Sequence, residues 1–492
     1  MNYDVIIIGA GSGGVGSVYA LKEQLSEVKA DYKIAVVEIN EVLGGNATAG
    51  WVDTWLQAMI PPYMEPIIRD ISGLDVSTQR EKYWLRGQFS KNQEDICLTL
   101  DKQELADRYM NDIQNDIHID LYLEHCFIDA EMSEEGVVNF ITIKDLNSGE
   151  CKKLFGQYYI DASADGVLCR SCCPKEGQDY LCGRDSKKLF NEKSAQNGGD
   201  LQQINEASLM YQISPNVDVS ELLASIQTVY PQYDANGRII SIVKPDYITT
   251  SGYPVYLKDG NVIINPMTGQ SKYPYTELIG VTREESYEQY SKYMLEHWKF
   301  IKLSCQKAYE NGESNYNKVY NTKLRGYGFT GKKASYLGVR ETYRIICEEM
   351  MTQSDMTKLI TEKTAKENKY IGESSHIIDF HISTGLSGLD DFNKKELRPH
   401  GIKYAAIIPK KMKNVLIGSR CYGASQIFLA GARGNFTIAY LGYSAGVAIA
   451  LCVKRKETDV RNVNIDELQE KTQFLERVRI LQSMYRNSII GD

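Results

Sequence analysis

Hydrophobic positions follow two different spacings within the first forty residues. A continuous apolar run predicts a buried strand at Asp4–Ile8, and a glycine-rich segment follows it. Apolar residues then recur every three or four positions from Val15 to Val28, which predicts a helix with one apolar face. A second strand is predicted at Lys33–Glu38. This order predicts two parallel strands joined by a helix.

Short strands dominate the pattern from there to about residue 160. One helix is predicted first, at Lys102–Asn115. Four strands separated by turn signals follow it, at Ile119–Leu123, Phe127–Met132, Val137–Lys144 and Cys151–Ile160. Their close spacing predicts an antiparallel meander attached to the parallel sheet.

The middle of the chain has a different character. Residues 183–402 are richer in Tyr, Asn and Ser and combine strands such as Gly260–Asn265 with a long helix at Glu284–Asn311. The last part is again apolar and rich in glycine, with a strand, an apolar helix and a polar helix at Asn414–Ile417, Phe436–Val453 and Asp466–Ser483. We therefore predict a nucleotide-binding domain in two pieces, 1–182 and 403–492, separated by a substrate domain, 183–402.

Composition and charge narrow the possible partners. The 492 residues are 43% hydrophobic, and 56 Lys and Arg against 64 Asp and Glu give a net charge of −8, so nucleic acid is not an expected partner. The start, Met1-Asn2-Tyr3, runs directly into the first strand and predicts no secretion signal. Polar and glycine residues interrupt Phe436–Val453, which favours a buried helix over a membrane span. We expect a cytoplasmic protein with no membrane partner.

The cysteines raise the question of a metal site. Eleven scattered thiols fit a reducing compartment better than a disulfide framework. One group is close in sequence: Cys169, Cys172, Cys173 and Cys182. Such spacing can hold zinc or an iron–sulfur cluster, but a second pair of thiols is missing from it. We therefore favour free thiols and predict no metal ligands.

The segment Gly9-Ala10-Gly11-Ser12-Gly13-Gly14 lies between a predicted strand and a predicted helix. In that context the glycine pattern indicates dinucleotide binding. Gly9 allows a tight turn, Gly11 lets the backbone approach a pyrophosphate, and Gly14 allows close contact between helix and strand. Glu38, at the end of the second strand, can accept hydrogen bonds from ribose hydroxyls. These residues predict an adenine dinucleotide, but they do not separate FAD from NAD.

Further motifs extend along the chain. They are Val37-Glu38 with Gly44-Gly45-Asn46-Ala47-Thr48, and then Tyr159–Gly166, Leu337–Arg344, Ile378–His381, Ile407–Pro409 and Asn414–Cys421. Together with the glycine loop they resemble the FAD-dependent oxidoreductase family of the glutathione-reductase type over nearly the whole chain. The sequence departs from that family at Ser163-Ala164, where Thr-Gly is commoner, and at Ser419, where Gly is commoner.

The resemblance implies FAD as the cofactor and an α/β fold. A Rossmann-like FAD-binding domain with a β-meander would be discontinuous, and an α+β substrate domain would complete the fold. The helix that follows Asn435 would direct its positive end at the flavin. The implied cofactor-binding residues are Gly9, Gly11, Ser12, Gly13, Gly14, Glu38, Gly44, Gly45, Asn46, Asp161, Ala162, Asp165, Arg420 and Asn435.

Candidates for catalysis are few, because the chain has only six histidines. His381 lies in one of the motifs, and His400 precedes the return to the nucleotide domain, so each can transfer a proton beside a flavin or serve a structural role. Arg340 and Arg344 are four residues apart on a predicted helix. They can clamp a substrate carboxylate or pair with neighbouring glutamates.

The predicted function is hydride transfer between a carbon atom of a small-molecule substrate and non-covalent FAD. One alternative is a flavoprotein that acts as an electron-transfer or assembly subunit, with a metal or a partner at Cys169–Cys182. Another is an NAD-dependent dehydrogenase without flavin.

Overall fold

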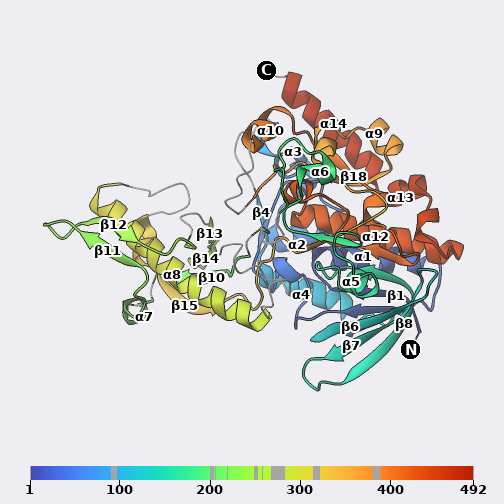
Figure 1. The fold of residues 1–492 in the computed structure, drawn as a ribbon, viewed down its shortest axis with the longest axis horizontal. Helices are drawn as coiled ribbons and strands as arrows, with labels where there is room; N and C mark the ends of the chain where they lie inside the picture. The colour runs from blue at the N-terminus through green and yellow to red at the C-terminus, as the bar shows by residue number, and fades with distance from the viewer. Residues whose placement is uncertain are drawn as a thin grey trace.

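The computed structural model places the chain in two lobes (Figure 1). The larger lobe contains both termini, and the smaller lobe holds α7, α8 and β10 to β15. The structure describes residues 2–89, 97–199, 204–205, 207–215, 217–218, 220–248, 253–257, 259–266, 283–313, 322–380 and 388–490.

A parallel sheet forms the centre of the larger lobe. Its order is β5-β2-β1-β8, with β19 also paired to β8, and all of these strands run in the same direction. Ile7 of β1 shows the register of the sheet: it lies opposite Val36 of β2 on one side and Ile160 of β8 on the other. The strands are β1 (Asn2–Ile8), β2 (Ile34–Val37), β5 (Ile119–Tyr122), β8 (Cys151–Asp161) and β19 (Val415–Ile417). The predicted unit of strand, helix and strand is confirmed.

Three of the four strands of the predicted meander form one. The assignment of the first, Ile119–Leu123, to the meander was wrong, because it forms β5 and pairs in parallel with β2. β6 (His125–Met132) and β7 (Val138–Asp145) pair in antiparallel fashion, and β7 pairs with the first half of β8. The second half of β8, from Tyr158 to Asp161, lies beside β1. One long strand therefore joins the meander to the parallel sheet, and it ends where the sheet presents its carboxyl edge.

Two helices pack closely against each other beside this sheet. They are α1 (Ser12–Ser26) and α12 (Asn435–Arg455). Their backbones approach so closely that a Cβ atom added at Gly442 would lie 1.9 Å from the carbonyl oxygen of Gly13. Ser17 Oγ donates to the carbonyl oxygen of Gly442 at 2.8 Å. Glycine on both helices is what permits this contact.

Helix α12 is, within the described ranges, the one helix long and apolar enough to cross a membrane by length and composition. Yet 94% of its most apolar 18-residue window is buried inside the protein. This burial is typical of a core helix.

The smaller lobe has its own hydrophobic cluster, which extends from Ala207 to Val339. A four-stranded sheet of β13 (Tyr253–Tyr256), β14 (Val262–Asn265), β10 (Tyr211–Ser214) and β15 (Gly328–Lys333) packs with α8 (Arg283–Glu310). Residues from Ile345 onward pack in the core of the larger lobe instead. The domain limits remain a prediction. The chain joins the core of the larger lobe from Ile345 onward, which is earlier than the predicted boundary at residue 402.

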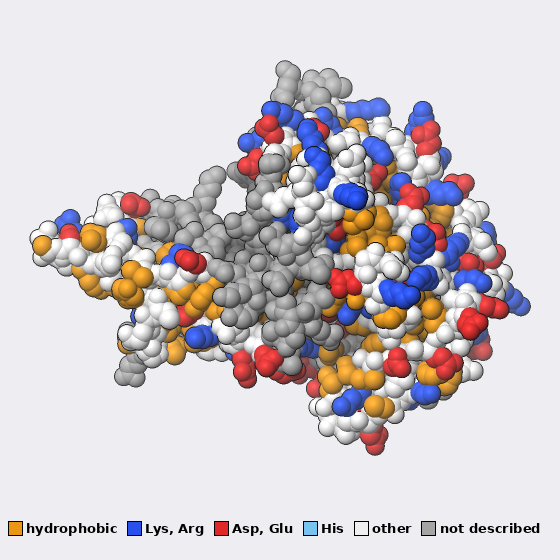
Figure 2. All heavy atoms as spheres, in the orientation of Figure 1, with side chains coloured by type: hydrophobic (Ala, Val, Ile, Leu, Met, Phe, Trp, Pro, Cys, Tyr) orange, Lys and Arg blue, Asp and Glu red, His pale blue; other side chains and the backbone are white. Residues whose placement is uncertain are grey.

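A two-stranded hairpin extends from the smaller lobe. Its strands are β11 (Tyr230–Tyr233) and β12 (Ile239–Val243), and α7 (Ser220–Ala224) lies near it. Tyr233 and Ile240 are more than half exposed. Figure 2 shows such hydrophobic side chains at the far end of this lobe.

Further helices and strands complete the larger lobe. In the larger lobe they are β3 (Thr54–Trp55), α2 (Met64–Ser72), α3 (Arg80–Trp84), β4 (Leu98–Thr99), α4 (Lys102–Ile113), α5 (Val167–Cys172), β9 (Tyr180–Cys182), α6 (Lys187–Phe190), β16 (Tyr343–Ile345), α9 (Glu362–Glu367), β17 (Tyr370–Ser374), α10 (Leu389–Lys395), β18 (His400–Lys403), α11 (Gln426–Gly431), α13 (Ile465–Lys471) and α14 (Phe474–Ile490). The predicted single helix at Asp466–Ser483 was wrong: Gln473, with a φ of +55°, separates α13 from α14.

The contact between α1 and α12 leads to a stability prediction. A methyl group at residue 442 would overlap the backbone of α1, so we expect Gly442→Ala to lower the free energy of unfolding by about 2 kcal/mol in urea titrations. Gly326→Ala is the control, because a Cβ atom there meets nothing within 4 Å. Equal stability of the two variants would contradict the described contact.

Candidate functional site

The glycine loop lies at the carboxyl end of β1 and is held tightly on one side. Gly9 has a φ of +90°, and a Cβ atom on it would lie 2.5 Å from the carbonyl oxygen of Ala162. A Cβ atom on Gly14 would lie 2.0 Å from the carbonyl oxygen of Gly9, and one on Gly13 would lie 1.8 Å from that of Gly418. At Gly11, in contrast, a Cβ atom would meet nothing within 4 Å. The loop therefore packs through Gly9, Gly13 and Gly14 and leaves open space at Gly11.

Glu38 closes one end of this loop. It is buried and accepts hydrogen bonds from Ala10 N at 2.6 Å, Asn40 N at 2.9 Å and Asn40 Nδ2 at 2.6 Å. Burial raises the pKa of Glu38, while these bonds and the charge of Arg283 oppose the rise. Arg283 Nη2 in α8 donates to Asn40 Oδ1 at 3.1 Å. No local pattern predicts the roles of Asn40 and Arg283, because their contact joins residues 243 positions apart.

A second glycine turn lies directly against the first. Gly44 and Gly45 have φ angles of +103° and +54°, and Gly44 N donates to the carbonyl oxygen of Ala10 at 2.7 Å. Asn46 Nδ2 donates to the carbonyl oxygen of Val339 at 2.8 Å. Asn46 therefore holds the segment that enters the larger lobe from the smaller one.

The end of β8 contributes structural contacts. Asp161 is fully buried, and its carboxylate accepts from Ser163 Oγ at 2.6 Å and from Cys169 N at 3.1 Å. Ala162 N donates to the carbonyl oxygen of Ile8 at 2.8 Å. These bonds fix the loop after β8 beside the glycine loop, so Asp161 acts on the site through the position of that loop.

Asp165 and Arg420 meet beside this loop. Asp165 Oδ1 accepts from Thr342 Oγ1 at 2.7 Å and from Arg420 Nη2 at 3.3 Å. Ala164 has a φ of +68°, which is a conformation that glycine adopts without strain. Its N–H donates to Ser419 Oγ at 3.2 Å. The two departures from the family pattern, at residues 164 and 419, are therefore in contact.

The amino end of α12 meets the amino end of α1. Ser12 Oγ donates to Asn435 Oδ1 at 3.2 Å, and Asn435 Nδ2 donates to the carbonyl oxygen of Val52 at 3.4 Å. Both helices are long, so both present partial positive charge at this point. Trp51, which precedes Val52, has a φ of +56°, and such strain in a bulky residue often marks a functional site. The sequence offered no local signal for Trp51 or Val52.

The predicted catalytic residues do not form one group. His381 lies outside the described residues. His400 in β18 is fully buried, its Nδ1 lies 2.8 Å from the carbonyl oxygen of Arg398, and its ring is 5.2 Å from that of Phe428. Burial lowers the pKa of His400 to about 4. These contacts favour a structural role.

The predicted helix that carries Arg340 and Arg344 was wrong. Residues 343–345 form β16, which pairs with β9, so the two arginines do not share a helical face. Arg344 is fully buried and donates to both carboxylate oxygens of Asp185, at 2.5 and 3.0 Å. Arg340 Nη1 donates to Ser208 Oγ at 2.8 Å. The local sequence pattern predicted a helix, but pairing with the distant strand β9 determines the conformation of these residues.

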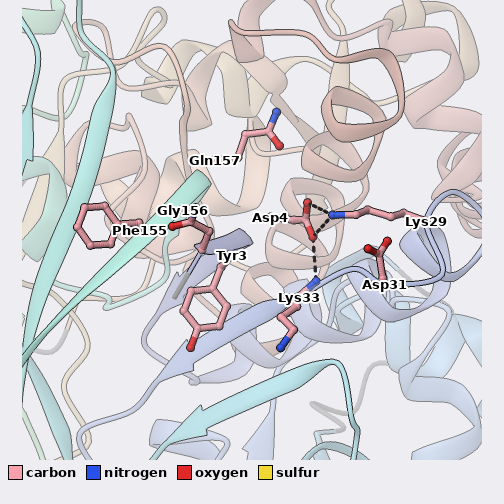
Figure 3. Close-up of a pocket in the computed structure, with 9 residues that line it drawn as sticks. Tyr3, Asp4, Lys29, Asp31, Lys33, Phe155, Gly156 and Gln157 are labelled. Carbon is pink, nitrogen blue, oxygen red and sulfur yellow. Dashed lines mark hydrogen bonds and ion pairs between the residues drawn. The ribbon is translucent and has the colours of Figure 1, made fainter.

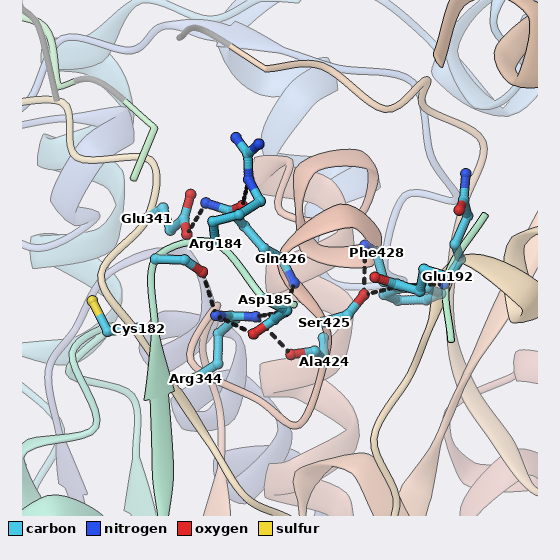
Figure 4. Close-up of polar contacts among 12 residues, drawn as sticks. Cys182, Arg184, Asp185, Glu192, Glu341, Arg344, Ala424, Ser425, Gln426 and Phe428 are labelled. Carbon is cyan, nitrogen blue, oxygen red and sulfur yellow. Dashed lines mark hydrogen bonds and ion pairs between the residues drawn. The ribbon is translucent and has the colours of Figure 1, made fainter. Parts of the chain in front are cut away.

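The Arg344–Asp185 pair belongs to a buried polar network (Figure 4). Gln426 N in α11 donates to Asp185 Oδ2 at 2.7 Å, and Gln426 Nε2 donates to Glu341 Oε1 at 2.8 Å. Arg184 Nε donates to Gln426 Oε1 at 2.8 Å. The network fixes three segments that are far apart in sequence around the start of α11.

The four cysteines that raised the question of a metal are divided between two elements. Cys169 and Cys172 lie in α5, Cys173 follows it, and Cys182 in β9 has its Sγ 3.4 Å from the carbonyl oxygen of Thr342. Burial raises the pKa of each of the four thiols. Within the described ranges no group of three or more His, Cys, Asp or Glu side chains is arranged to hold a metal ion.

A surface pocket of about 650 Å³ lies away from these residues (Figure 3). It surrounds Asp4, which pairs with Lys29 at 2.8 Å and accepts from Lys33 N at 2.8 Å. These residues are at the amino ends of β1 and β2. Ligands of open parallel sheets bind at the carboxyl ends of the strands, so this pocket is not part of the candidate site.

Glu373 in β17 supports the first turn of α12. Its carboxylate accepts from Met59 N at 2.9 Å and from Ser375 Oγ, and its carbonyl oxygen accepts from Thr437 Oγ1 at 3.2 Å. Burial raises the pKa of Glu373 to about 8 and outweighs these bonds. The carboxyl group is therefore protonated at neutral pH.

Comparison with known protein families gives a match over most of the chain. The sequence model of a family described as FAD dependent oxidoreductase matches residues 4–472. Among curated protein sequences we found no match.

Several solved structures are similar at low identity. The myxobacterial chondrochloren halogenase CndH is 10% identical over 98% of this chain and 82% of its own, with a TM-score of 0.42. The p-nitrophenol 4-monooxygenase PnpA from Pseudomonas putida DLL-E4 is 9% identical over 98% and 89%, with a TM-score of 0.39. A flavoprotein/dehydrogenase from Cytophaga hutchinsonii is 12% identical over 99% and 86%, with a TM-score of 0.36.

The strained residue Ala164 leads to a prediction. A left-handed backbone costs a non-glycine residue about 1–2 kcal/mol, so we expect Ala164→Gly to raise the free energy of unfolding by about 1 kcal/mol. Ala130→Gly in β6 is the matched control and should lower it by about 0.5 kcal/mol. Chemical denaturation measures both, and a loss of stability in Ala164→Gly would contradict the described loop.

Glu373 leads to a prediction about pH. Its pKa is near 8 in the folded protein and near its ordinary value of 4.5 in the unfolded chain, so folding takes up a proton between these values. Stability from this group is complete below pH 4.5 and falls as pH rises to 8, by up to about 1.4 kcal/mol per pH unit. We expect Glu373→Gln to remove that slope in urea titrations from pH 5 to 8. Parallel pH profiles for the two proteins would refute the buried, protonated state.

Proposed function

Because the chain belongs to the FAD-dependent oxidoreductase family, we propose that it transfers a hydride between a carbon atom of a small organic substrate and non-covalent FAD. The family assignment confirms the predicted cofactor, FAD, and excludes the alternative of an NAD enzyme without flavin. When bound, FAD supplies the hydride acceptor. The glutathione-reductase type and the cytoplasmic location remain predictions.

The observation that carries the proposal is the meeting of three features at one edge of the sheet. The glycine loop has open space at Gly11, Glu38 lies at the end of β2, and the amino ends of α1 and α12 meet through Ser12 and Asn435. Open space beside the loop suits a pyrophosphate, and the helix ends favour negative charge. A carboxylate at the end of the second strand suits a ribose. The residues present therefore fit FAD.

Hydride transfer at carbon also needs a group that moves a proton. Within the described part of the site, Asp53 is the best placed. It follows Val52, whose carbonyl oxygen accepts from Asn435, and it is only 4% exposed. Burial raises the pKa of Asp53 to about 6, although Lys102 opposes the rise. A carboxyl group with this pKa can accept a proton at neutral pH, and we propose this role for Asp53.

An electron-transfer or assembly subunit is the alternative. It would use a metal or a partner at Cys169–Cys182. Metal analysis of the purified protein separates the two functions, since bound iron or zinc would favour the alternative.

An absorption spectrum tests the proposed function first. We expect flavin bands that acid precipitation releases into the supernatant, and bleaching when one class of polyol, amino acid or hydroxy acid is added without oxygen. Oxygen uptake that depends on NAD(P)H would indicate hydroxylation instead. A colourless protein that takes up no added FAD would contradict the proposal.

Glu38 allows a sharper test of the cofactor site. We expect Glu38→Ala to raise the dissociation constant of FAD at least about 10-fold, because a buried charged hydrogen bond contributes about 1.5–3 kcal/mol. Fluorescence titration of the apoprotein measures this constant. Glu135→Ala, an exposed change in the turn after β6, is the control. Unchanged FAD affinity in Glu38→Ala would place the ribose elsewhere.

A further inference from the structure

Two buried side chains beside the amino end of α12 have polar atoms without partners, and we infer that Gln57 and Trp55 bind the imide edge of the flavin. This edge consists of the C2 carbonyl, the N3–H group and the C4 carbonyl of the ring system. The inference rests on the proposed function, because it takes FAD as the cofactor. It goes further in naming two residues, outside the motifs along the chain, that orient the reactive ring.

Gln57, which follows β3, has an amide group that the protein does not use. Its side chain is 2% exposed, and neither Oε1 nor Nε2 has a hydrogen-bond partner among the described residues. No other described side chain has two such atoms. A buried amide without partners is unfavourable, and native proteins pair nearly all groups of this kind. A ligand that pairs both atoms removes this cost.

Trp55 in β3 adds a second unused donor. It is 1% exposed, and its Nε1 has no hydrogen-bond partner within the described ranges. The centre of its ring lies 4.8 Å from that of Phe436, the second residue of α12. An indole N–H can only donate. The two side chains therefore offer two donors and one acceptor beside the first turn of α12.

Contacts on both sides of Gln57 hold its segment at this place. A Cβ atom added at Gly434, the N-cap of α12, would lie 3.5 Å from Leu56 Cβ. Met59 N donates to Glu373 Oε2 at 2.9 Å, and the carbonyl oxygen of Glu373 accepts from the first turn of α12. No side-chain hydrogen bond caps α12, so its first N–H groups are open to the same ligand.

The imide edge of a flavin matches these unused groups. It presents one N–H donor between two carbonyl acceptors, whereas Gln57 and Trp55 together present two donors and one acceptor. A carboxamide can pair with a neighbouring donor and acceptor at the same time, as it does with the edge of a base. The amino end of α12 favours the partial negative charge of a carbonyl oxygen. The pyrophosphate and the ribose already have the glycine loop and Glu38.

The test compares FAD with 3-methyl-FAD, in which a methyl group replaces the N3 hydrogen. After removal of its own FAD, the natural protein should bind 3-methyl-FAD at least about 10-fold more weakly than FAD, because the pairing with Gln57 is lost. Gln57→Met keeps the length of the side chain and removes both polar atoms. It should weaken FAD binding about 10-fold and bind the two flavins with similar affinity in fluorescence titrations.

Two further measurements separate this role from a structural one. Thermal unfolding of the protein without FAD should show no loss of stability in Gln57→Met, since the change breaks no hydrogen bond of the described structure. In the holoenzyme, Gln57→Met and Trp55→Phe should each shift the visible absorption bands of the flavin, because a carbonyl group of the ring loses a donor.

Gln353→Met is the matched control. Gln353 is also 2% exposed, but Ser194 pairs both ends of its amide: Nε2 donates to Ser194 Oγ at 2.7 Å, and Oε1 accepts from Ser194 N at 3.0 Å. This variant should lose thermal stability and keep the preference of the natural protein for FAD over 3-methyl-FAD.

Three outcomes would overturn the inference. They are equal affinity of the natural protein for the two flavins, unchanged FAD affinity in Gln57→Met, which would mean that buried water pairs the amide, and a preference for FAD that survives in this variant. If Gln57→Met is misfolded, the same comparison with Gln57→Leu decides. A natural protein that takes up no FAD would refute the proposed function instead, so the two failures are distinguishable.

Discussion

The close contact between α1 and α12 is the constraint on which the rest of the larger lobe depends. Glycine at positions 13 and 442 lets the two backbones meet, and Ser17 bonds the carbonyl oxygen of Gly442. A helix from the last part of the chain is thereby aligned with the first helix, and both amino ends reach the carboxyl edge of the parallel sheet. The cofactor site is a consequence of this alignment, because backbone amides and helix dipoles converge there.

The second constraint is a buried network in the larger lobe, close to where the chain returns from the smaller one. Arg344 and Asp185 form an ion pair with little exposure, and Gln426 connects the pair to Glu341. A buried ion pair contributes little net stability compared with apolar packing, but removing one partner is costly. Its value here lies in specificity: it fixes where the chain re-enters the larger lobe. Asn46 reinforces that position through the carbonyl oxygen of Val339.

Local signals explain what the sequence could predict. The parallel strands, Glu38 and the apolar helix α12 can each be predicted from a short run of residues, and the structure contains them. The contact of Ser12 with Asn435 joins residues 423 positions apart, which no spacing rule reveals. The same limit explains the error at Arg344. The local sequence predicted a helix there, but the residues form a strand that pairs with the distant strand β9. Ala164 and Ser419 are 255 positions apart in the sequence, and only the structure shows that they are in contact.

Arg344 and Arg433 show that partners, and not residue type, set the charge environment of a buried arginine. Both are arginines held inside the protein near residues of the same motifs. Asp185 pairs with Arg344, and the pKa of Arg344 is raised despite burial. Burial lowers the pKa of Arg433 to about 10, although Asp379 opposes this effect. Asp185 accepts a hydrogen bond from each terminal nitrogen of Arg344 and so offsets the cost of burying that guanidinium.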